Sequence, residues 1–267
     1  MAEHIGTDNV GLARFSVSRN GVLAYRTGET GGRLLWVDRS GKELDPVGEK
    51  GDYTNPALSP AGDRLAFSLS DPRGGKTDVW IRDLARGVSS RFTFGGANNG
   101  VPLWSPDGST IAFATDRFST DLATLRTGPY AIALLDVATG RVSQLPGARG
   151  VRQVNPQWSP DGLSLYFLSD PDGITNVYQL SLASGQLSQI TDLFTGVSGI
   201  TETSPALTVA QRSGRLIYSV FRANGYELYG VDNPTAVAAA PVTAYRPYGS
   251  TVPPAAVLPP LQRSGAM

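Results

Sequence analysis

A short turn motif recurs five times along the chain and constrains its fold more than any other feature. In each copy a short strand runs into a Ser-Pro-Asp-Gly-like turn, and the strand that follows ends on an aromatic residue. Counted from the serine or threonine that opens the turn, successive copies lie 41 to 54 residues apart. Strand-rich units repeating at such a period are typical of β-propeller blades. The copies are 15–25 (FSVSRNGVLAY), 56–67 (PALSPAGDRLAF), 102–113 (PLWSPDGSTIAF), 156–167 (PQWSPDGLSLYF) and 205–218 (PALTVAQRSGRLIY).

The chemistry of the turn explains its repetition. Proline presets φ at the second turn position, aspartate tolerates the third, and glycine supplies the positive φ from which the next strand departs. We therefore expect Gly108 and Gly162 to adopt positive φ. The first and last copies depart most from the motif, with Arg19-Asn20-Gly21 in the first and a turn lengthened around Ser213-Gly214 in the last. Terminal repeats lack one ordinary neighbour, so this variation is expected.

A second hairpin follows the first four copies and completes a four-stranded unit. Apolar and polar residues alternate along these segments, which favours strands over helices. The sequence thus predicts an all-β fold, a β-propeller of four-stranded antiparallel blades with five repeats visible, and leaves a partial or composite sixth open. The propeller should span 11–233, preceded by a strand or extension at 1–10 and followed by a Pro/Ala-rich extension at 234–267 with a candidate closing strand at 241–248. The turn glycines of the second hairpins are Gly41, Gly87, Gly140 and Gly185.

Two copies of WSPDG, at 104–108 and 158–162, carry a family resemblance. Together with the following I-A-F strand and the D-x-x-[ST]-G hairpin, they resemble the TolB-type, WD-repeat-like propellers over roughly 11–233. Members of that family commonly have six blades and are exported. Residues 11–118 also resemble the propeller that follows the kinase domain of some bacterial Ser/Thr kinases. The VSGIT stretch at 197–201 resembles propellers beside bacterial metallopeptidase-type domains.

Composition narrows the range of partners. The chain has 23 basic residues (Lys and Arg) and 23 acidic residues (Asp and Glu). No net electrostatic field therefore favours binding to nucleic acid or to an anionic membrane. No apolar run approaches the roughly 20 residues that span a bilayer. The N-terminus, MAEHIGTDNV, shows neither a basic nor an apolar signal region. We expect a monomer that binds a protein or peptide, periplasmic if the resemblance holds for a longer precursor and cytoplasmic otherwise.

Catalytic and metal-binding patterns are absent from the sequence. His4 is the sole histidine and the chain has no cysteine, so a Ser-His-Asp triad or a multi-histidine metal site cannot be built from it. Asp170-Pro171-Asp172-Gly173 resembles the start of a calcium loop but lacks the glutamate at position twelve, and a hairpin turn explains it. The glycine-rich stretch 95–100 lacks the Lys-Ser/Thr of a phosphate loop. We predict no catalytic residue, metal or cofactor.

Binding is instead predicted where loops enter the innermost strands, because these loops form one mouth of a propeller's channel. Their amide-rich side chains suit hydrogen bonds to a peptide or a sugar, although they could equally satisfy one another and water. The sequence favours a non-catalytic protein- or peptide-binding scaffold. Two alternatives stay open: a sensor module of a kinase or peptidase, and a carbohydrate-processing or hydrolytic propeller. The candidate partner-binding residues are Tyr53, Asn55, Asn99, Gln153, Asn155, Glu202 and Thr203.

Overall fold

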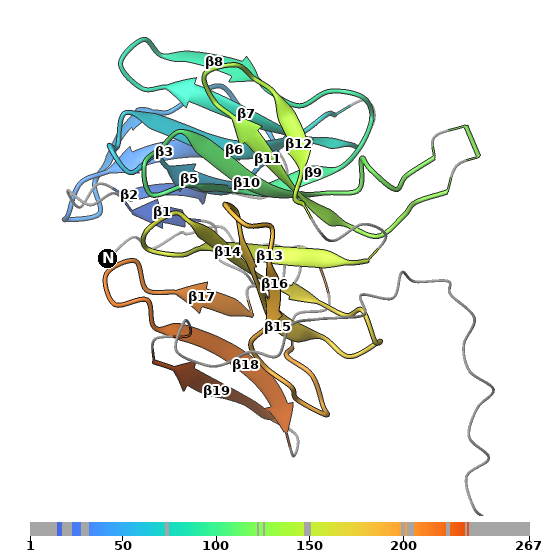
Figure 1. The fold of residues 1–267 in the computed structure, drawn as a ribbon. Helices are drawn as coiled ribbons and strands as arrows, with labels where there is room; N and C mark the ends of the chain where they lie inside the picture. Colours follow the sequence, from blue (N-terminus) through green and yellow to red (C-terminus); the bar gives the residue numbers. More distant parts are fainter. Residues whose placement is uncertain are drawn as a thin grey trace, which may run out of the picture.

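In the computed structural model, the described residues form five antiparallel sheets (Figure 1). The first contains β1 (Phe15–Val17), β2 (Leu23–Thr27), β3 (Arg33–Val37) and β4 (Glu43–Pro46). The second contains β5 (Tyr53–Leu58), β6 (Arg64–Ser70), β7 (Thr77–Asp83) and β8 (Val88–Arg91). The third contains β9 (Asn99–Trp104), β10 (Thr110–Thr115), β11 (Ala131–Asp136) and β12 (Val142–Gln144). The fourth contains β13 (Gln153–Trp158), β14 (Ser164–Ser169), β15 (Asn176–Ser181) and β16 (Leu187–Gln189), and the fifth β17 (Leu207–Val209), β18 (Leu216–Arg222) and β19 (Gly225–Val231).

The all-β prediction is confirmed, and four of the sheets have the predicted four strands in up-and-down order. The fifth sheet has three strands among the described residues. The candidate closing strand at 241–248 and the strand or extension at 1–10 lie outside the described residues. The structure describes residues 15–17, 23–27, 32–72, 75–121, 123–124, 126–146, 151–198, 201, 206–222, 225–232 and 234.

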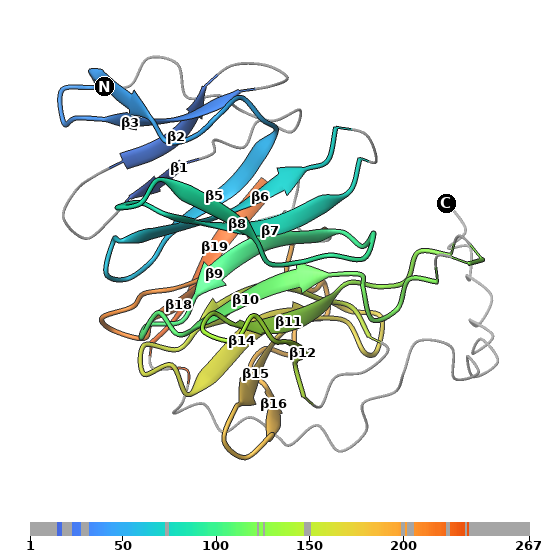
Figure 2. The same cartoon turned by 90° about the horizontal axis from the view of Figure 1, so that it is seen from above.

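Consecutive sheets pack face to face in chain order (Figure 2). Four apolar clusters fill the four interfaces between neighbouring sheets, so the core is divided among nearest neighbours. Tryptophans of the WSPDG motifs also join the innermost strands of adjacent sheets. The indole N–H of Trp104 donates to the Ala57 carbonyl at 2.9 Å, and that of Trp158 donates to the Leu103 carbonyl at 3.2 Å.

The Ser-Pro-Asp-Gly turns of successive sheets lie side by side at one end of the molecule. Gly108 and Gly162 both adopt φ of +73°, as predicted. A methyl group added at Gly162 would lie 3.4 Å from Cδ of Pro106, and one added at Gly108 would lie 3.6 Å from Cδ of Pro60. We call this the turn end of the molecule. Because the strands of each sheet alternate in direction, the loops that enter the innermost strands lie at the opposite end, the loop end.

Side-chain hydrogen bonds explain why serine and aspartate recur in these turns. The Ser105 hydroxyl donates to the Asp107 carboxylate at 2.5 Å and accepts the N–H of Thr110 at 3.0 Å. The Ser105 hydrogen bond is the largest of the causes that lower the pKa of Asp107. Ser159 and Asp161 repeat the arrangement, and the pKa of Asp161 is lowered for the same reason.

Candidate functional site

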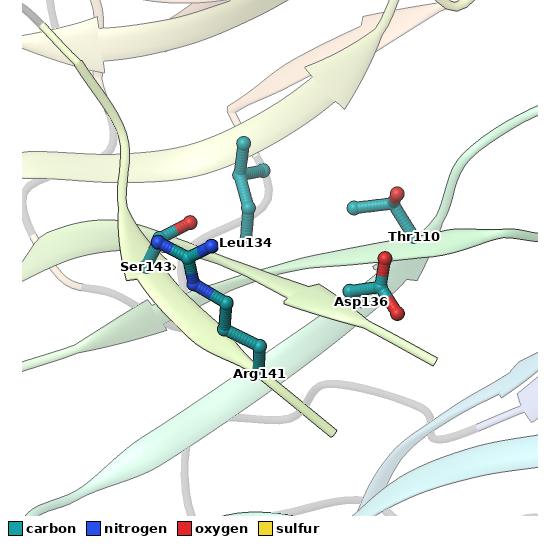
Figure 3. Close-up of a pocket in the computed structure, with 5 residues that line it drawn as sticks. All are labelled: Thr110, Leu134, Asp136, Arg141 and Ser143. Atoms are coloured by element: carbon teal, nitrogen blue, oxygen red, sulfur yellow. The ribbon is translucent and has the colours of Figure 1, made fainter. Parts of the chain in front are cut away.

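A surface cavity of about 360 Å³ lies over β10, β11 and β12 (Figure 3). Its only carboxylate is Asp136, whose pKa is lowered chiefly by the hydrogen bond from the backbone N–H of Thr139. A single carboxylate does not provide the acid and base pair that glycoside hydrolysis requires. The cavity is lined by Thr110, Leu134, Asp136, Arg141 and Ser143.

The stretch that resembles a calcium loop is a turn, as predicted. The backbone N–H of Gly173 donates to the Asp170 carbonyl at 3.0 Å, and the Asp170 carboxylate pairs with Arg152 at 2.9 Å. Asn176 uses its side-chain oxygen to accept the Thr191 hydroxyl at 2.9 Å. Across the part of the chain that the structure describes, no three His, Cys, Asp or Glu side chains gather in a way that could hold a metal ion. Nor do these residues form a helix that could span a membrane.

Five of the seven predicted partner-binding residues lie in the structure, at the loop end, on β5, β9 and β13. Tyr53 and Asn99 are buried, as are the amides of the fourth sheet, and Asn55 is half-buried. Glu202 and Thr203 lie outside the described residues. Four of the predicted residues, Tyr53, Asn99, Gln153 and Asn155, are therefore buried and do not face solvent in this structure, whereas their predicted role in partner binding stays a prediction.

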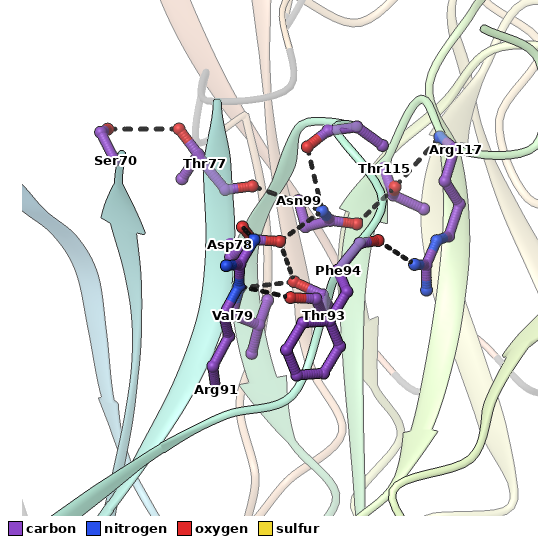
Figure 4. Close-up of polar contacts among 11 residues, drawn as sticks. Ser70, Thr77, Asp78, Val79, Arg91, Thr93, Phe94, Asn99, Thr115 and Arg117 are labelled. Atoms are coloured by element: carbon purple, nitrogen blue, oxygen red, sulfur yellow. Dashed lines mark hydrogen bonds and ion pairs between the residues drawn. The ribbon is translucent and has the colours of Figure 1, made fainter. Parts of the chain in front are cut away.

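Asn99 shows why a buried amide is tolerated here (Figure 4). Its amide nitrogen donates to the Asp78 carboxylate at 3.2 Å and to the Ala97 carbonyl at 3.2 Å. Its side-chain oxygen accepts the Thr115 hydroxyl at 2.7 Å. Buried polar groups require such partners. Asn99 therefore joins β7, β9 and β10 beneath the loop end.

The two amides of β13 join the fourth sheet to its neighbours. Asn155 accepts the backbone N–H groups of Ala206 and Leu207 of the fifth sheet, at 3.0 and 2.8 Å. Gln153 accepts the N–H of Ile132 in the third sheet at 3.2 Å. The Gln153 amide nitrogen is buried and has no hydrogen-bond partner among the residues that the structure describes. These amides thus hold adjacent sheets together at the loop end.

Each innermost strand of the second, third and fourth sheets contains a bulge with an unusual backbone. Asn55, Val101 and Asn155 have φ of +50°, +57° and +54°, and each is followed by proline. Positive φ is tolerated by asparagine but is strained for the β-branched Val101. The pairing register with the next strand shifts at each bulge. The same unusual backbone conformation thus recurs in the three innermost strands, close to the loop end.

Several exposed aromatic side chains lie at the loop end, where the sequence did not predict them. Two of them lie in loops that follow a fourth strand, and three lie where a second strand turns back into a third. At the turn end, by contrast, the exposed large apolar side chains among the described residues are aliphatic, such as Leu163 and Val88. The aromatic residues are Phe94, Phe118, Phe194, Phe221 and Tyr226, with Phe194 93% exposed.

One of these aromatics, Phe94, contacts two arginines, and Phe118 directly follows the second of them in the sequence; we call Arg91, Phe94, Arg117 and Phe118 the Phe94 patch. The Arg91 guanidinium lies over the Phe94 ring, 5.0 Å from its centroid, and pairs with Asp78 at 2.5 Å. The Arg117 guanidinium donates to the Phe94 carbonyl at 2.8 Å (Figure 4). No described carboxylate forms an ion pair with Arg117. The patch therefore offers exposed rings beside an unneutralised guanidinium.

The loop that carries Phe94 is fixed from below. Asn98 donates its backbone N–H to the Asp116 carboxylate at 2.7 Å and its amide to the same carboxylate at 3.0 Å. Because Asp116 precedes Arg117 and Phe118, these bonds couple the two loops of the patch. A surface held in one conformation loses less entropy when a partner binds.

Comparison with known proteins identifies the class of this chain. No family model matches it. It is 36% identical to a TolB homolog of Chlorobium chlorochromatii over 116 residues, 43% of this chain and 23% of that protein. It is 29% identical to dipeptidyl-peptidase 5 of Porphyromonas gingivalis over 131 residues, 48% of this chain and 18% of that protein. The matches thus span less than a quarter of either relative.

The solved structure of TolB from Acinetobacter baumannii has the same fold, with a TM-score of 0.60 and 19% identity over 78% of this chain and 49% of that one. The chain is therefore a β-propeller, distantly homologous to TolB-like and peptidase-associated propellers. This confirms the resemblance that the WSPDG motifs predict.

Proposed function

We propose that this propeller is a non-catalytic scaffold that binds a protein or peptide at its loop end. The observation that carries the proposal is that five exposed aromatic side chains lie at that end, with the rings of Phe221 and Tyr226 in contact at 5.3 Å between centroids. Exposed apolar groups that adjoin one another mark interaction surfaces more often than singly scattered ones do. Aromatic residues and arginine are also the types that most often dominate binding energy at protein interfaces.

The Phe94 patch indicates the chemistry of the partner. Phe94 and Phe118 supply apolar area for an aliphatic or aromatic side chain. Arg117 supplies charged N–H donors that match a carboxylate. We expect the partner to present an apolar side chain next to an acidic one. Affinity should then fall moderately with salt, since one half-buried guanidinium takes part.

The predicted binding residues have a supporting part in this proposal. Asn99 anchors the strand that follows the Phe94 loop, and Asn155 anchors the fifth sheet. Asn55 is the least buried of the described members and lies at the same end of the molecule. The site therefore combines a rigid amide layer with the exposed rings above it.

Capture of a partner from a bacterial lysate, followed by titration of the purified partner, tests the proposal. Phe94→Ala and Phe118→Ala should each weaken binding about 30-fold, equivalent to about 2 kcal/mol. Leu163→Ala is the matched control, because Leu163 is also an exposed apolar residue but lies at the turn end. Equal affinity of all three variants and the unmodified protein would contradict the proposal.

A second candidate is a propeller module of a larger peptidase, which the match to dipeptidyl-peptidase 5 favours. Under this candidate the loop end would select peptides for a catalytic domain elsewhere. Short free peptides would then compete with the captured partner for the Phe94 patch. Partner binding that is unaffected by millimolar peptide mixtures would favour the scaffold instead.

A further inference from the structure

A hydrogen-bonded cluster lies beneath the loop that carries Phe94, and we call its residues, Asp78, Arg91 and Thr93, the Phe94 anchor (Figure 4). The Thr93 hydroxyl donates to the Asp78 carboxylate at 2.6 Å and accepts the backbone N–H of Val79 at 2.9 Å. The Arg91 guanidinium pairs with the same carboxylate and donates to the Thr93 carbonyl at 2.9 Å. The guanidinium that lies over the Phe94 ring is therefore itself held by β7 and by the backbone of the loop.

The fourth sheet repeats this cluster with uncharged residues. Asn176 is the equivalent of Asp78, because each lies two positions before the residue that pairs with the phenylalanine of the second strand. The Thr191 hydroxyl donates to the Asn176 side-chain oxygen at 2.9 Å and accepts a backbone N–H of β15 at 2.9 Å. Gln189 lies two residues before this threonine, as Arg91 does in the second sheet, and donates to the Thr191 carbonyl at 2.8 Å. The two sheets thus share the hydrogen bonds of the threonine but differ in charge.

The comparison of the two sheets shows what the charged pair adds. Uncharged residues are sufficient to hold this position in the fourth sheet, and a buried ion pair is a weak source of stability because desolvation offsets its attraction. Phe194 lies in the equivalent loop of the fourth sheet and is 93% exposed, whereas Phe94 is 57% exposed. Among the described residues, no cationic group lies over the Phe194 ring. The covered ring is therefore the feature that accompanies the charged pair.

We propose that Arg91 is a positioning residue of the loop-end binding site: held by Asp78, its guanidinium covers one face of the Phe94 ring and leaves the other face open to the partner. The inference rests on the proposed function. A guanidinium suits this position because it stacks on an aromatic face while its N–H groups donate in its own plane. A ring that is already fixed in one orientation loses less conformational entropy when the partner binds.

Exchanging the charged pair for the uncharged pair of the fourth sheet tests the proposal. The double variant Asp78→Asn with Arg91→Gln copies Asn176 and Gln189, and it keeps the net charge because it removes one acidic and one basic residue. We expect it to unfold at nearly the urea midpoint of the unmodified protein. Arg91→Gln alone should unfold at a lower midpoint, because the Asp78 side chain is 6% exposed and would lose its ion-pair partner.

A fluorine label on the Phe94 ring reports the position of the ring without any partner. In the double variant its fluorine NMR shift should move toward that of the same label on Phe194, a ring without a described cation over it. The double variant should also bind the partner purified after capture about 5-fold more weakly, the loss expected when one side chain must be ordered on binding. Arg91→Lys keeps a charge beside Asp78 but lacks the planar fork, so it should change the shift and the affinity in the same directions.

Several outcomes would overturn the proposal. An unchanged fluorine shift in the double variant would show that Arg91 does not place the ring. Unchanged affinity of the double variant, while Phe94→Ala weakens binding, would show that the placement does not matter to the partner. If the double variant unfolds at a much lower midpoint, Arg91→Lys decides in its place, and an unchanged shift and affinity in that variant would overturn the proposal. Normal binding by Phe94→Ala would instead contradict the proposed function, and this inference would fail with it.

Discussion

Replacing Asn155 by alanine should destabilise the propeller strongly, although a surface-binding role alone would leave its stability unchanged. The Asn155 side-chain oxygen accepts the N–H groups of Ala206 and Leu207, which are 6% and 3% exposed. An unpartnered buried donor costs about 1–3 kcal/mol, and two are created. Alanine at φ of +54° adds up to about 1 kcal/mol relative to asparagine. We expect a loss of about 2–7 kcal/mol in the free energy of unfolding.

Asn55→Ala is the matched control for this substitution. Asn55 also precedes proline in an innermost strand and has φ of +50°, but its side chain forms no hydrogen bond with a described residue. It should therefore lose only the backbone contribution, about 1 kcal/mol. Urea unfolding followed by circular dichroism measures both variants, with the slope showing whether the transition stays comparable. Equal losses in the two variants would refute the role assigned to the Asn155 hydrogen bonds.

Two further predictions concern the turns and the core. Gly162→Val should cost about 1–3 kcal/mol, because φ is +73° and the new side chain would meet Pro106, whereas Ser109→Ala in the neighbouring turn should change little. Similar urea midpoints for Gly162→Val and Ser109→Ala would show that the turn motif does not depend on the positive φ of its glycine. Burial raises the pKa of Tyr166 to about 12, so the folded state keeps the neutral phenol while the unfolded chain ionises near its ordinary value of 10. The stability that this provides is present below pH 10 and lost as the pH rises toward 12, and Tyr166→Phe should reduce that loss in alkaline unfolding experiments. The same alkaline loss in both proteins would contradict it.

The fold was predictable because its information is local and repeated. Each Ser-Pro-Asp-Gly turn depends on residues within a few positions, such as the Ser105 hydroxyl and the Asp107 carboxylate. The positive φ of Gly108 and Gly162 follows from the same local chemistry. Because the motif recurs at a blade-like spacing, local turns were enough to indicate the propeller.

The burial of the candidate binding residues could not be predicted from the sequence, because its determinants are not local. The residue type of Asn155 indicated a polar loop residue. Its hydrogen-bond partner Leu207, however, belongs to the next sheet and lies far away in the sequence. Nothing in the local pattern distinguishes a solvated amide from one that accepts hydrogen bonds from the next sheet. Conversely, an aromatic residue such as Phe94 is usually buried, so its residue type predicts burial. Its exposure is known only from the structure, which places the loop that carries it.

The central claim is that partners bind at the loop end, and a hydrogen-exchange footprint of the captured partner on this propeller tests it most directly. Binding should slow exchange in the loops at 94–98 and 116–120, which carry Phe94 and Phe118. Exchange in the turns at 105–109 and 159–163 should stay unchanged. Slower exchange at those turns, with no change around Phe94 and Phe118, would contradict the account.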